Sequence, residues 1–153
     1  MRKMILRMME NTTTNYKTDY MEPALADDNI NEISSLGLAH IGDAVYELMA
    51  RTWLVTHGKL TSRGLHDATV EIVRAQAQAQ AVRALLEKLS EEEQVVYRRG
   101  RNTRTHSVPR GAQSDDYHAA TGLETLIGWL YLKHRRDRIN ELFEMIMEAA
   151  YAS

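Results

Sequence analysis

Two acidic residues stand inside apolar, helix-like stretches of the sequence, about eighty residues apart. Asp43 lies in the segment IGDAVYE and Glu124 in the segment ATGLETLIG. An ionised carboxylate drawn toward a packed interior is destabilising by several kcal/mol unless a partner compensates it. Two such residues therefore suggest a shared cation. Magnesium is the natural candidate, because it prefers oxygen ligands and is commonly held by one or two carboxylates beside substrate phosphates.

A magnesium ion held by two carboxylates is suited to phosphodiester hydrolysis. This reaction needs an activated water and stabilisation of the charge on the phosphoryl oxygens and the leaving oxygen. Asp43 and Glu124, on different helices, could hold the ion from two sides. The alternatives are that Asp43 only caps or hydrogen-bonds within its helix, and that Glu124 is a surface or salt-bridged acid. Glu47, one turn after Asp43, is interpreted as a solvated or paired surface residue.

A short basic segment follows the middle of the chain. Residues 98 to 110 contain five arginines and no acid, while the whole chain has a formal net charge of −2. That balance excludes a protein coated in positive potential, so the charge has to be judged locally. We expect this segment to be an exposed loop that contacts phosphates, although a solvated charge run is the alternative. The candidate RNA-binding residues are Arg98, Arg99, Arg101, Asn102 and Arg104.

The elements that would position these residues are helices. Two prolines, eight glycines and abundant Ala, Leu, Glu, Gln and Arg favour an all-α fold, and strand-like alternation is hard to find. The apolar periodicity predicts helices at about 30–56, 65–89, 115–134 and 137–151, with a shorter helix that begins at a Ser90–Glu93 capping box and stops near Gly100. The Ala-Gln repeat at 75–80 is interpreted as ordinary helix-forming sequence.

The first predicted helix has two distinct faces. Ile41, Val45 and Leu48 form an apolar stripe, and Asp43 lies on the other side with small neighbours such as Ala39. These small residues leave room for an ion or for another helix to approach. The three histidines nearest these segments, His40, His106 and His118, lack metal-site spacing and receive no role.

Length and composition limit the protein class. A chain of 153 residues suits one domain, and the absence of cysteine excludes disulfides and thiolate metal sites. The apolar run at the N-terminus is too short for the core of a signal peptide or for a membrane span. We therefore expect a cytoplasmic protein with no membrane association. Residues 1–29 are expected to form a flexible leader, and 30–153 the folded domain.

Three ordered blocks carry a family resemblance. The segments LGLAHIGDAVYE (36–47), RRGRN (98–102) and ATGLETLIGWLYL (120–132) resemble the ribonuclease III catalytic domain, and most closely the short form of that family, Mini-ribonuclease III. The resemblance implies a helical homodimer that cleaves double-stranded RNA with Mg²⁺, leaving 5′-phosphate and 3′-hydroxyl ends. For the short form it implies maturation of the large-subunit (23S) ribosomal RNA precursor. Asp43 and Glu124 match the family's catalytic and metal-binding acids.

The chain departs from full-length ribonuclease III at three acidic positions, where it has Leu36, Ala39 and Thr121. The short form shows the same departures, which make the ion site less anionic. The length leaves no room for a separate double-stranded RNA-binding domain, so we expect RNA affinity to come from the catalytic domain itself. Two alternatives stay open. One is a non-catalytic RNA-binding ribosome-assembly factor with this fold, and the other is a helical protein-interaction module without salt-dependent RNA affinity.

Overall fold

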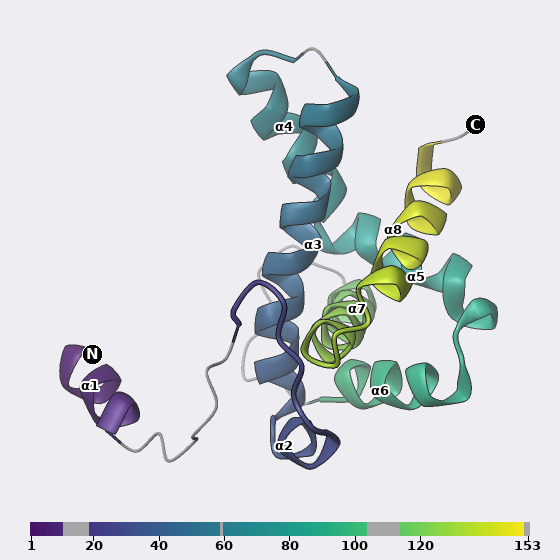
Figure 1. Ribbon diagram of the computed structural model, residues 1–153. Coiled ribbons are helices and arrows are strands. Elements are labelled where there is room, and N and C mark those ends of the chain that lie inside the picture. Colours follow the sequence, from purple (N-terminus) through teal and green to yellow (C-terminus); the bar gives the residue numbers. More distant parts are fainter. Residues whose placement is uncertain (11–18, 59, 104–113, 152–153) are drawn as a thin grey trace.

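The computed structural model describes residues 1–10, 19–58, 60–103 and 114–151, and every regular element in these ranges is helical, as predicted. Figure 1 gives their arrangement. The helices are α1 (Arg2–Glu10), α2 (Asp27–Asn31), α3 (Ser35–His57), α4 (Ser62–Val73), α5 (Ala75–Leu85), the 3₁₀ turn η1 (Leu86–Lys88), α6 (Glu91–Arg101), α7 (Ser114–Leu132) and α8 (Arg136–Tyr151).

Helix α7 is the centre of the fold. It packs against α3, α5, α6 and α8, which surround it in Figure 1. From Ala119 to Leu130 every residue of α7 is buried except Glu124. A helix that is apolar on all sides is stable only when other elements cover it, which explains the central position of α7. Glu124 is therefore the one partly exposed side chain in a stretch of three helical turns.

Two predicted helices are divided in the structure. The helix expected at 30–56 is α2 followed by α3, and Ser34 caps α3 by accepting a hydrogen bond from the Gly37 amide at 3.0 Å. The helix expected at 65–89 is α4, α5 and η1, because Arg74 has an extended backbone (ψ 147°) between α4 and α5. Helix α4 packs on α3, whereas α5 packs on α7 and α8. One straight helix could not reach both sets of partners.

The buried face of α3 also differs from the predicted one. The predicted apolar stripe of Ile41, Val45 and Leu48 is only half-buried or exposed, with Leu48 at 55% exposure. The buried residues are Leu38, Ala39, Gly42, Tyr46, Ala50 and Leu54. This face combines large apolar residues with small ones, and α7 approaches closely at Gly42, so residue size as well as hydrophobicity decides which side of α3 is covered.

The predicted capping box at the start of α6 is confirmed. The Ser90 side chain accepts from the Glu93 amide, and Glu93 Oε2 accepts from the Ser90 amide at 2.9 Å. The same carboxylate accepts two hydrogen bonds from the Arg138 guanidinium in α8, at 2.8 and 2.9 Å, and Glu93 is only 5% exposed. This bidentate pair fixes the start of α6 against α8.

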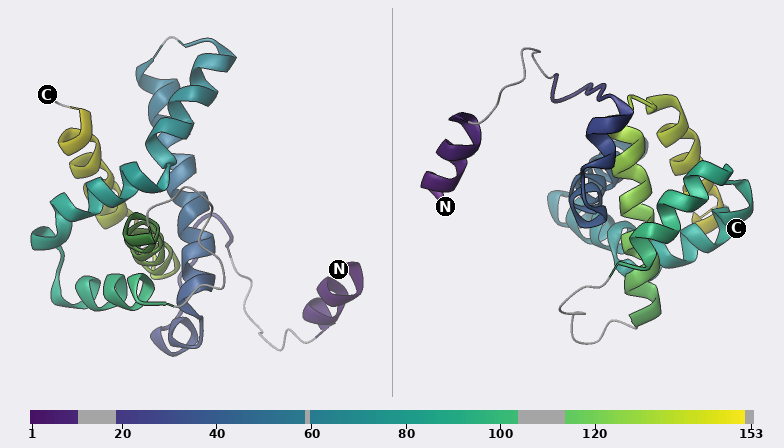
Figure 2. Two further views of the ribbon diagram at one scale, coloured as in Figure 1. Left: turned by 180° about the vertical axis from the view of Figure 1, so that it is seen from behind. Right: turned by 90° about the horizontal axis from the view of Figure 1, so that it is seen from below.

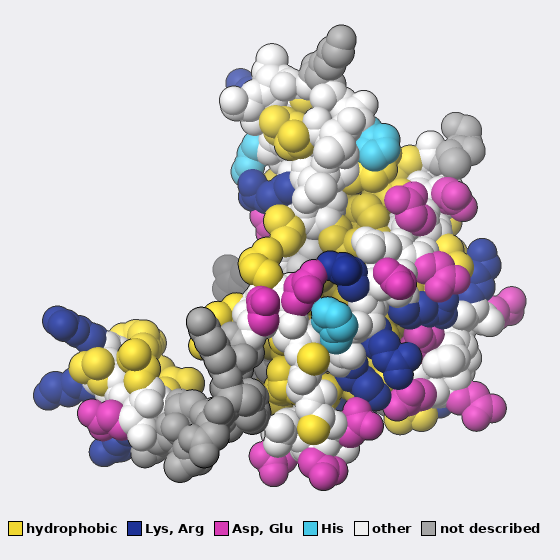
Figure 3. Space-filling model, viewed as in Figure 1, with side chains coloured by type: hydrophobic (Ala, Val, Ile, Leu, Met, Phe, Trp, Pro, Cys, Tyr) yellow, Lys and Arg dark blue, Asp and Glu magenta, His cyan; other side chains and the backbone are white. Residues whose placement is uncertain are grey.

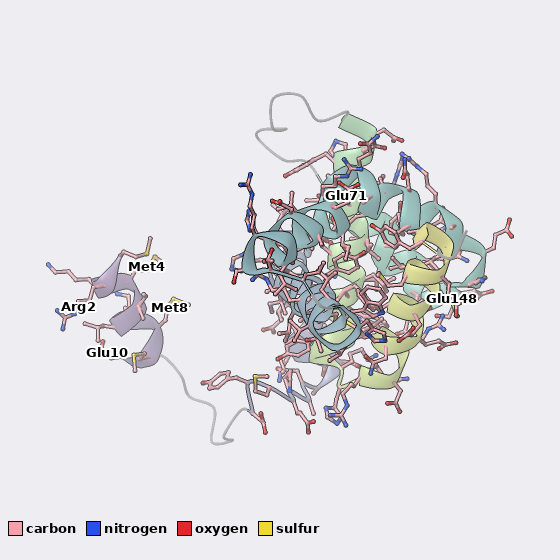
Figure 4. The ribbon with its side chains drawn as sticks, turned by 90° about the horizontal axis from the view of Figure 1, so that it is seen from above. Arg2, Met4, Met8, Glu10, Glu71 and Glu148 are labelled. Atoms are coloured by element: carbon pink, nitrogen blue, oxygen red, sulfur yellow. The ribbon has the colours of Figure 1, made fainter. Side chains whose placement is uncertain are left out.

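The N-terminal region has two parts in the structure. Residues 1–10 are exposed along their whole length, and α1 stands apart from the other helices in Figures 1, 2 and 4. Nearer the domain, the Leu25 amide donates to the Leu132 carbonyl at 2.9 Å, and the Tyr131 hydroxyl donates to the Tyr20 carbonyl. The division of the chain at residue 29 stays a prediction. None of the described helices has the length and apolarity needed to cross a bilayer.

Candidate functional site

Helices α3 and α7 each have a glycine at the point where they contact each other. A Cβ at Gly42 would lie 1.7 Å from the Glu124 carbonyl oxygen, and a Cβ at Gly128 would lie 1.9 Å from the Leu38 carbonyl oxygen. The two backbones are therefore in direct contact, closer than helices with larger side chains can approach. The contact places Asp43, next to Gly42, beside Glu124.

Asp43 and Glu124 interact across this contact. Asp43 is exposed and Glu124 is half-buried. Burial is the main cause that raises the pKa of the Glu124 carboxyl to about 8, and the charge of Asp43 raises it as well, while the Gln78 amide opposes the rise. The structure thus brings together the two acids that the sequence analysis selected. Their negative charges disfavour each other, which is the situation that a bound cation relieves.

No cation within the described chain neutralises these acids. Neither Asp43 nor Glu124 takes part in any ion pair among the described residues. The described part of the chain contains no group of three or more His, Cys, Asp or Glu side chains that could hold a metal ion. A hard divalent cation that keeps several waters fits such a donor set, since it needs only one or two carboxylates. Asp43 and Glu124 are the residues that would hold it.

The positions that are acidic in full-length ribonuclease III add no ligand here. The Thr121 hydroxyl lies one turn before Glu124 but donates to the Tyr117 carbonyl at 3.0 Å. Ala39 is buried, and Leu36 is 44% exposed. Glu47 forms an ion pair with Arg51 at 2.6 Å, which confirms its interpretation as a paired surface residue. These positions therefore add no carboxylate to Asp43 and Glu124 at the contact between α3 and α7.

The candidate RNA-binding arginines lie in a helix. Residues 98–101 form the last turn of α6, and Asn102 is its C-cap, so the predicted loop begins later than expected. The helix continues because no breaking residue precedes Gly100, and that glycine lies in close contact with Thr125 of α7. Arg98 and Arg99 are exposed. Arg104 and His106 lie outside the described residues.

Arg101 belongs to an ion-pair cluster that the sequence analysis did not predict. It pairs with Asp115 at 2.7 Å, and Arg83 of α5 pairs with both Asp115 and Asp116 at 2.8 Å. Basic and acidic side chains also lie next to each other in the centre and the lower right of the domain in Figure 3. Of the three arginines in the last turn of α6, Arg98 and Arg99 therefore have the positive charge that is available to a polyanion, whereas Arg101 is paired.

The last turn of α6, which carries the arginines, and the contact between α3 and α7, which carries the acids, both lie against α7. Gly100 contacts Thr125, the neighbour of Glu124, and Asp115 precedes Glu124 by nine residues, or about 13 Å along α7. Sequence reasoning missed Gln78, which interacts with Glu124 from α5. Its spacing to Val82 and Leu85 (i, i+4, i+7) places it on the buried face of α5 and was the available signal.

Comparisons with known proteins agree with this arrangement. A family model described as the ribonuclease III domain matches residues 36–135. The Mini-ribonuclease 3 of Clostridium tetani is 39% identical over 120 residues, covering 78% of this chain and 80% of that protein. The Mini-ribonuclease 3 of a Thermoanaerobacter species is 36% identical over 148 residues, covering 97% of both. The crystal structure of a Fusobacterium nucleatum protein superimposes with a TM-score of 0.71 at 29% identity, covering 78% of this chain and 96% of that one.

The helical fold around α7, together with the family match over residues 36–135, defines an endoribonuclease domain of the ribonuclease III type. This chain belongs to the ribonuclease III family and, within it, to the Mini-ribonuclease 3 group. The resemblance noted from three sequence blocks is confirmed.

Proposed function

We propose that this protein is a magnesium-dependent endoribonuclease that cleaves double-stranded RNA at the site formed by Asp43 and Glu124. One observation carries the proposal. Two acids that are far apart in the sequence lie beside each other where the backbones of α3 and α7 are in contact, and neither has an ion-pair partner among the described residues. The family membership supports ribonuclease activity, and the two-carboxylate donor set supports magnesium.

The chemistry follows from the positions of the two acids. A bound Mg²⁺ would supply an acidified water and charge stabilisation at the phosphate. Glu124 would be the deeper of the two ligands, and with a pKa raised to about 8 by burial and by Asp43 it would have to lose its proton to hold a cation. Asp43 faces solvent, where a substrate phosphate can approach. When water attacks the phosphorus and the P–O3′ bond breaks, the ends are a 5′-phosphate and a 3′-hydroxyl, which are the products that the resemblance to the family implies.

Recognition of the substrate is proposed to depend on duplex shape. A-form RNA displays phosphates and 2′-hydroxyls across a shallow minor groove, and few of its base edges are accessible. Arg98 and Arg99 are exposed and form no ion pair among the described residues, so they are available for phosphate contacts. Asn102 and Arg104 continue the same segment. The substrate we propose is a duplex region of the 23S ribosomal RNA precursor in the cytoplasm, on the basis of the resemblance to the short form of the family.

The active form is proposed to be a homodimer. A duplex has two antiparallel strands, and a two-fold enzyme offers one site to each. The apolar stripe of α3 that the monomer leaves partly uncovered, Ile41, Val45 and Leu48, supports this proposal. Such a stripe is a suitable surface for a second subunit.

The test is cleavage of a structured precursor RNA by the purified protein, with Mg²⁺ or with EDTA. We expect cleavage only with Mg²⁺. Asp43→Asn should fold normally and lose cleavage by at least about 10²-fold, whereas the matched control Asp67→Asn, at an exposed position of α4, should keep it. Full activity of Asp43→Asn would overturn the assignment of Asp43.

A second candidate is a non-catalytic RNA-binding ribosome-assembly factor. The three non-acidic positions, Leu36, Ala39 and Thr121, favour it because they leave a site with only two carboxylates. Salt-dependent binding of duplex RNA by the wild-type protein, without cleavage at any Mg²⁺ concentration, would select this candidate.

A further inference from the structure

Gln78 is a buried amide in a helix that otherwise buries small and apolar residues. Its side chain is 1% exposed, and its Nε2 atom has no hydrogen-bond partner among the described residues. The other buried residues of α5 are Ala79, Ala81, Val82 and Leu85. A buried donor without a partner is destabilising by about 1–3 kcal/mol, so packing alone would favour an apolar residue at this position.

The neighbouring glutamines behave differently. Gln76 and Gln80, two residues before and after Gln78, are exposed. They have the same side chain on the same helix, and solvent satisfies their amides. The burial of Gln78 therefore follows from its position on the face toward α7, and not from the composition of the Ala-Gln repeat.

Gln78 lies beside the carboxylate of Glu124. Helix α5 packs directly on α7. The amide is close enough to Glu124 to favour its charged form, yet Nε2 does not make a hydrogen bond of normal geometry to it. The Thr121 hydroxyl, one helical turn before Glu124, donates to the Tyr117 carbonyl. The amide nitrogen of Gln78 is thus a donor available to one oxygen of Glu124.

We propose that Gln78 is a positioning residue of the cation site: its amide donates to one oxygen of the ionised Glu124 and turns the other oxygen toward the bound cation. This inference rests on the function proposed above. It explains why an amide occupies an apolar contact, because the buried Nε2 atom, which has no partner among the described residues, would gain one in the Glu124 carboxylate once a cation holds that side chain in place. Groups that orient metal ligands in this way typically contribute 10–100-fold in metal affinity.

The experiment measures metal binding and stability separately. The probe is Mn²⁺ alone, titrated into the RNA-free protein and followed by water-proton relaxation. Gln78→Met keeps the volume and removes the amide, so Mn²⁺ affinity should fall about tenfold or more, while the unfolding temperature in EDTA should stay the same or rise. Gln78→Leu serves as a second variant in case the methionine packs poorly. Gln76→Met and Gln80→Met are the matched controls and should change neither quantity.

The outcomes separate this inference from the function on which it rests. Unchanged Mn²⁺ affinity in Gln78→Met and Gln78→Leu, with wild-type protein that cleaves duplex RNA, overturns the role of Gln78 alone. A lower unfolding temperature with unchanged Mn²⁺ affinity would mean that the amide is structural, and overturns it as well. A wild-type protein that neither binds Mn²⁺ nor cleaves RNA overturns the proposed function itself.

Discussion

The α-carbon of Gly42 rests on the carbonyl oxygen of Glu124, so closely that a Cβ at position 42 would lie 1.7 Å from that oxygen. The residue that precedes one acid thus touches the main chain of the other. The spacing of Asp43 and Glu124 is fixed by two backbones in contact, and not by flexible side chains. The proposed cation site has only these two carboxylates, so it requires such precision in their placement.

Replacing Gly42 should separate the two helices. In Gly42→Ala the methyl group would meet backbone atoms of α7, which cannot move as a side chain can. We expect a loss of about 3 kcal/mol or more in the free energy of unfolding, measured by urea denaturation in EDTA. Gly37→Ala is the matched control on the same helix. Its Cβ would meet only side-chain atoms, at 3.1 and 3.3 Å, so a similar loss there would contradict the explanation.

Neutralising Asp43 should change the titration of its partner. The charge of Asp43 raises the pKa of the Glu124 carboxyl above the value that burial alone produces. In Asp43→Asn this repulsion is absent, so the pKa of Glu124 should fall below about 8, as followed by NMR of a carboxyl-labelled glutamate. An unchanged titration of Glu124 would mean that the two acids do not interact.

Stability without metal should decrease as the pH rises. The pKa of Glu124 is raised from 4.5 to about 8 in the folded protein, so the folded state holds a proton that the unfolded state has lost. Between about pH 4.5 and 8 the contribution of Glu124 to the free energy of unfolding should therefore fall, by at most roughly 5 kcal/mol, and level off above pH 8. Urea denaturation in EDTA at several pH values measures it.

The variant Glu124→Gln isolates this effect from the six histidines of the chain. It cannot ionise at position 124, so the difference between wild type and variant should grow with pH in EDTA. Mg²⁺ should reverse the trend in the wild type only, because the cation binds the ionised carboxylate. Equal pH slopes in the two proteins would remove Glu124 as the source.

Much of this fold could be predicted from the sequence, and the failures have physical causes. Helix α7 and the capping box of α6 follow local rules that the sequence carries directly. The break at Arg74 depends on which helices α4 and α5 pack against, and arginine itself is a good helix former. The buried face of α3 was misassigned because Gly42 adds nothing to a hydrophobic pattern, although it decides how closely α7 approaches.

Some residues of the candidate site could likewise be predicted from the sequence, and others could not. Asp43 and Glu124 stand out because acids in apolar stretches are unusual, and they do meet. The pairing of Arg101 with Asp115 joins residues on different helices, and no local pattern marks it. Gln78 was hidden because its repeat looks uniform, and only the position of α7 distinguishes it from Gln76.

The arginines of α6 should contribute unequally to RNA affinity. Arg98→Ala and Arg99→Ala each remove an exposed charge without an ion-pair partner among the described residues. Each should weaken duplex binding and reduce the salt dependence by about one counterion. Arg101→Ala should change the salt slope less, because Asp115 already neutralises Arg101. Filter binding of a duplex RNA at several salt concentrations in EDTA gives the slopes.

Arg136→Ala is the control for this series, since Arg136 lies on α8 and pairs with Glu22. It should leave the salt slope unchanged. Equal slopes for Arg98→Ala, Arg99→Ala and Arg136→Ala would place the RNA contact elsewhere on the molecule.

The end of α7 offers a stabilising substitution away from the site. His134 has a left-handed backbone (φ 58°), and the Arg135 amide donates to the Leu130 carbonyl at 2.9 Å, as at helix ends that usually have glycine. His134→Gly should raise the free energy of unfolding by about 0.5–1 kcal/mol and leave cleavage unchanged. His134→Ala, which retains a Cβ, should give no such gain in thermal or urea unfolding.

Glu93 makes two kinds of contact, one within α6 and one to α8, so the stability of α6 depends on the position of α8. Its carboxylate caps the first turn of α6 and accepts two hydrogen bonds from Arg138 of α8. The helix that carries Arg98 and Arg99 is therefore bound at its start to α8. A nick or substitution that releases α8 would leave a buried negative charge at the root of α6 and loosen that helix. A change in α8, far from Asp43 and Glu124, would then weaken the RNA contacts proposed for Arg98 and Arg99 before it altered the cleavage step.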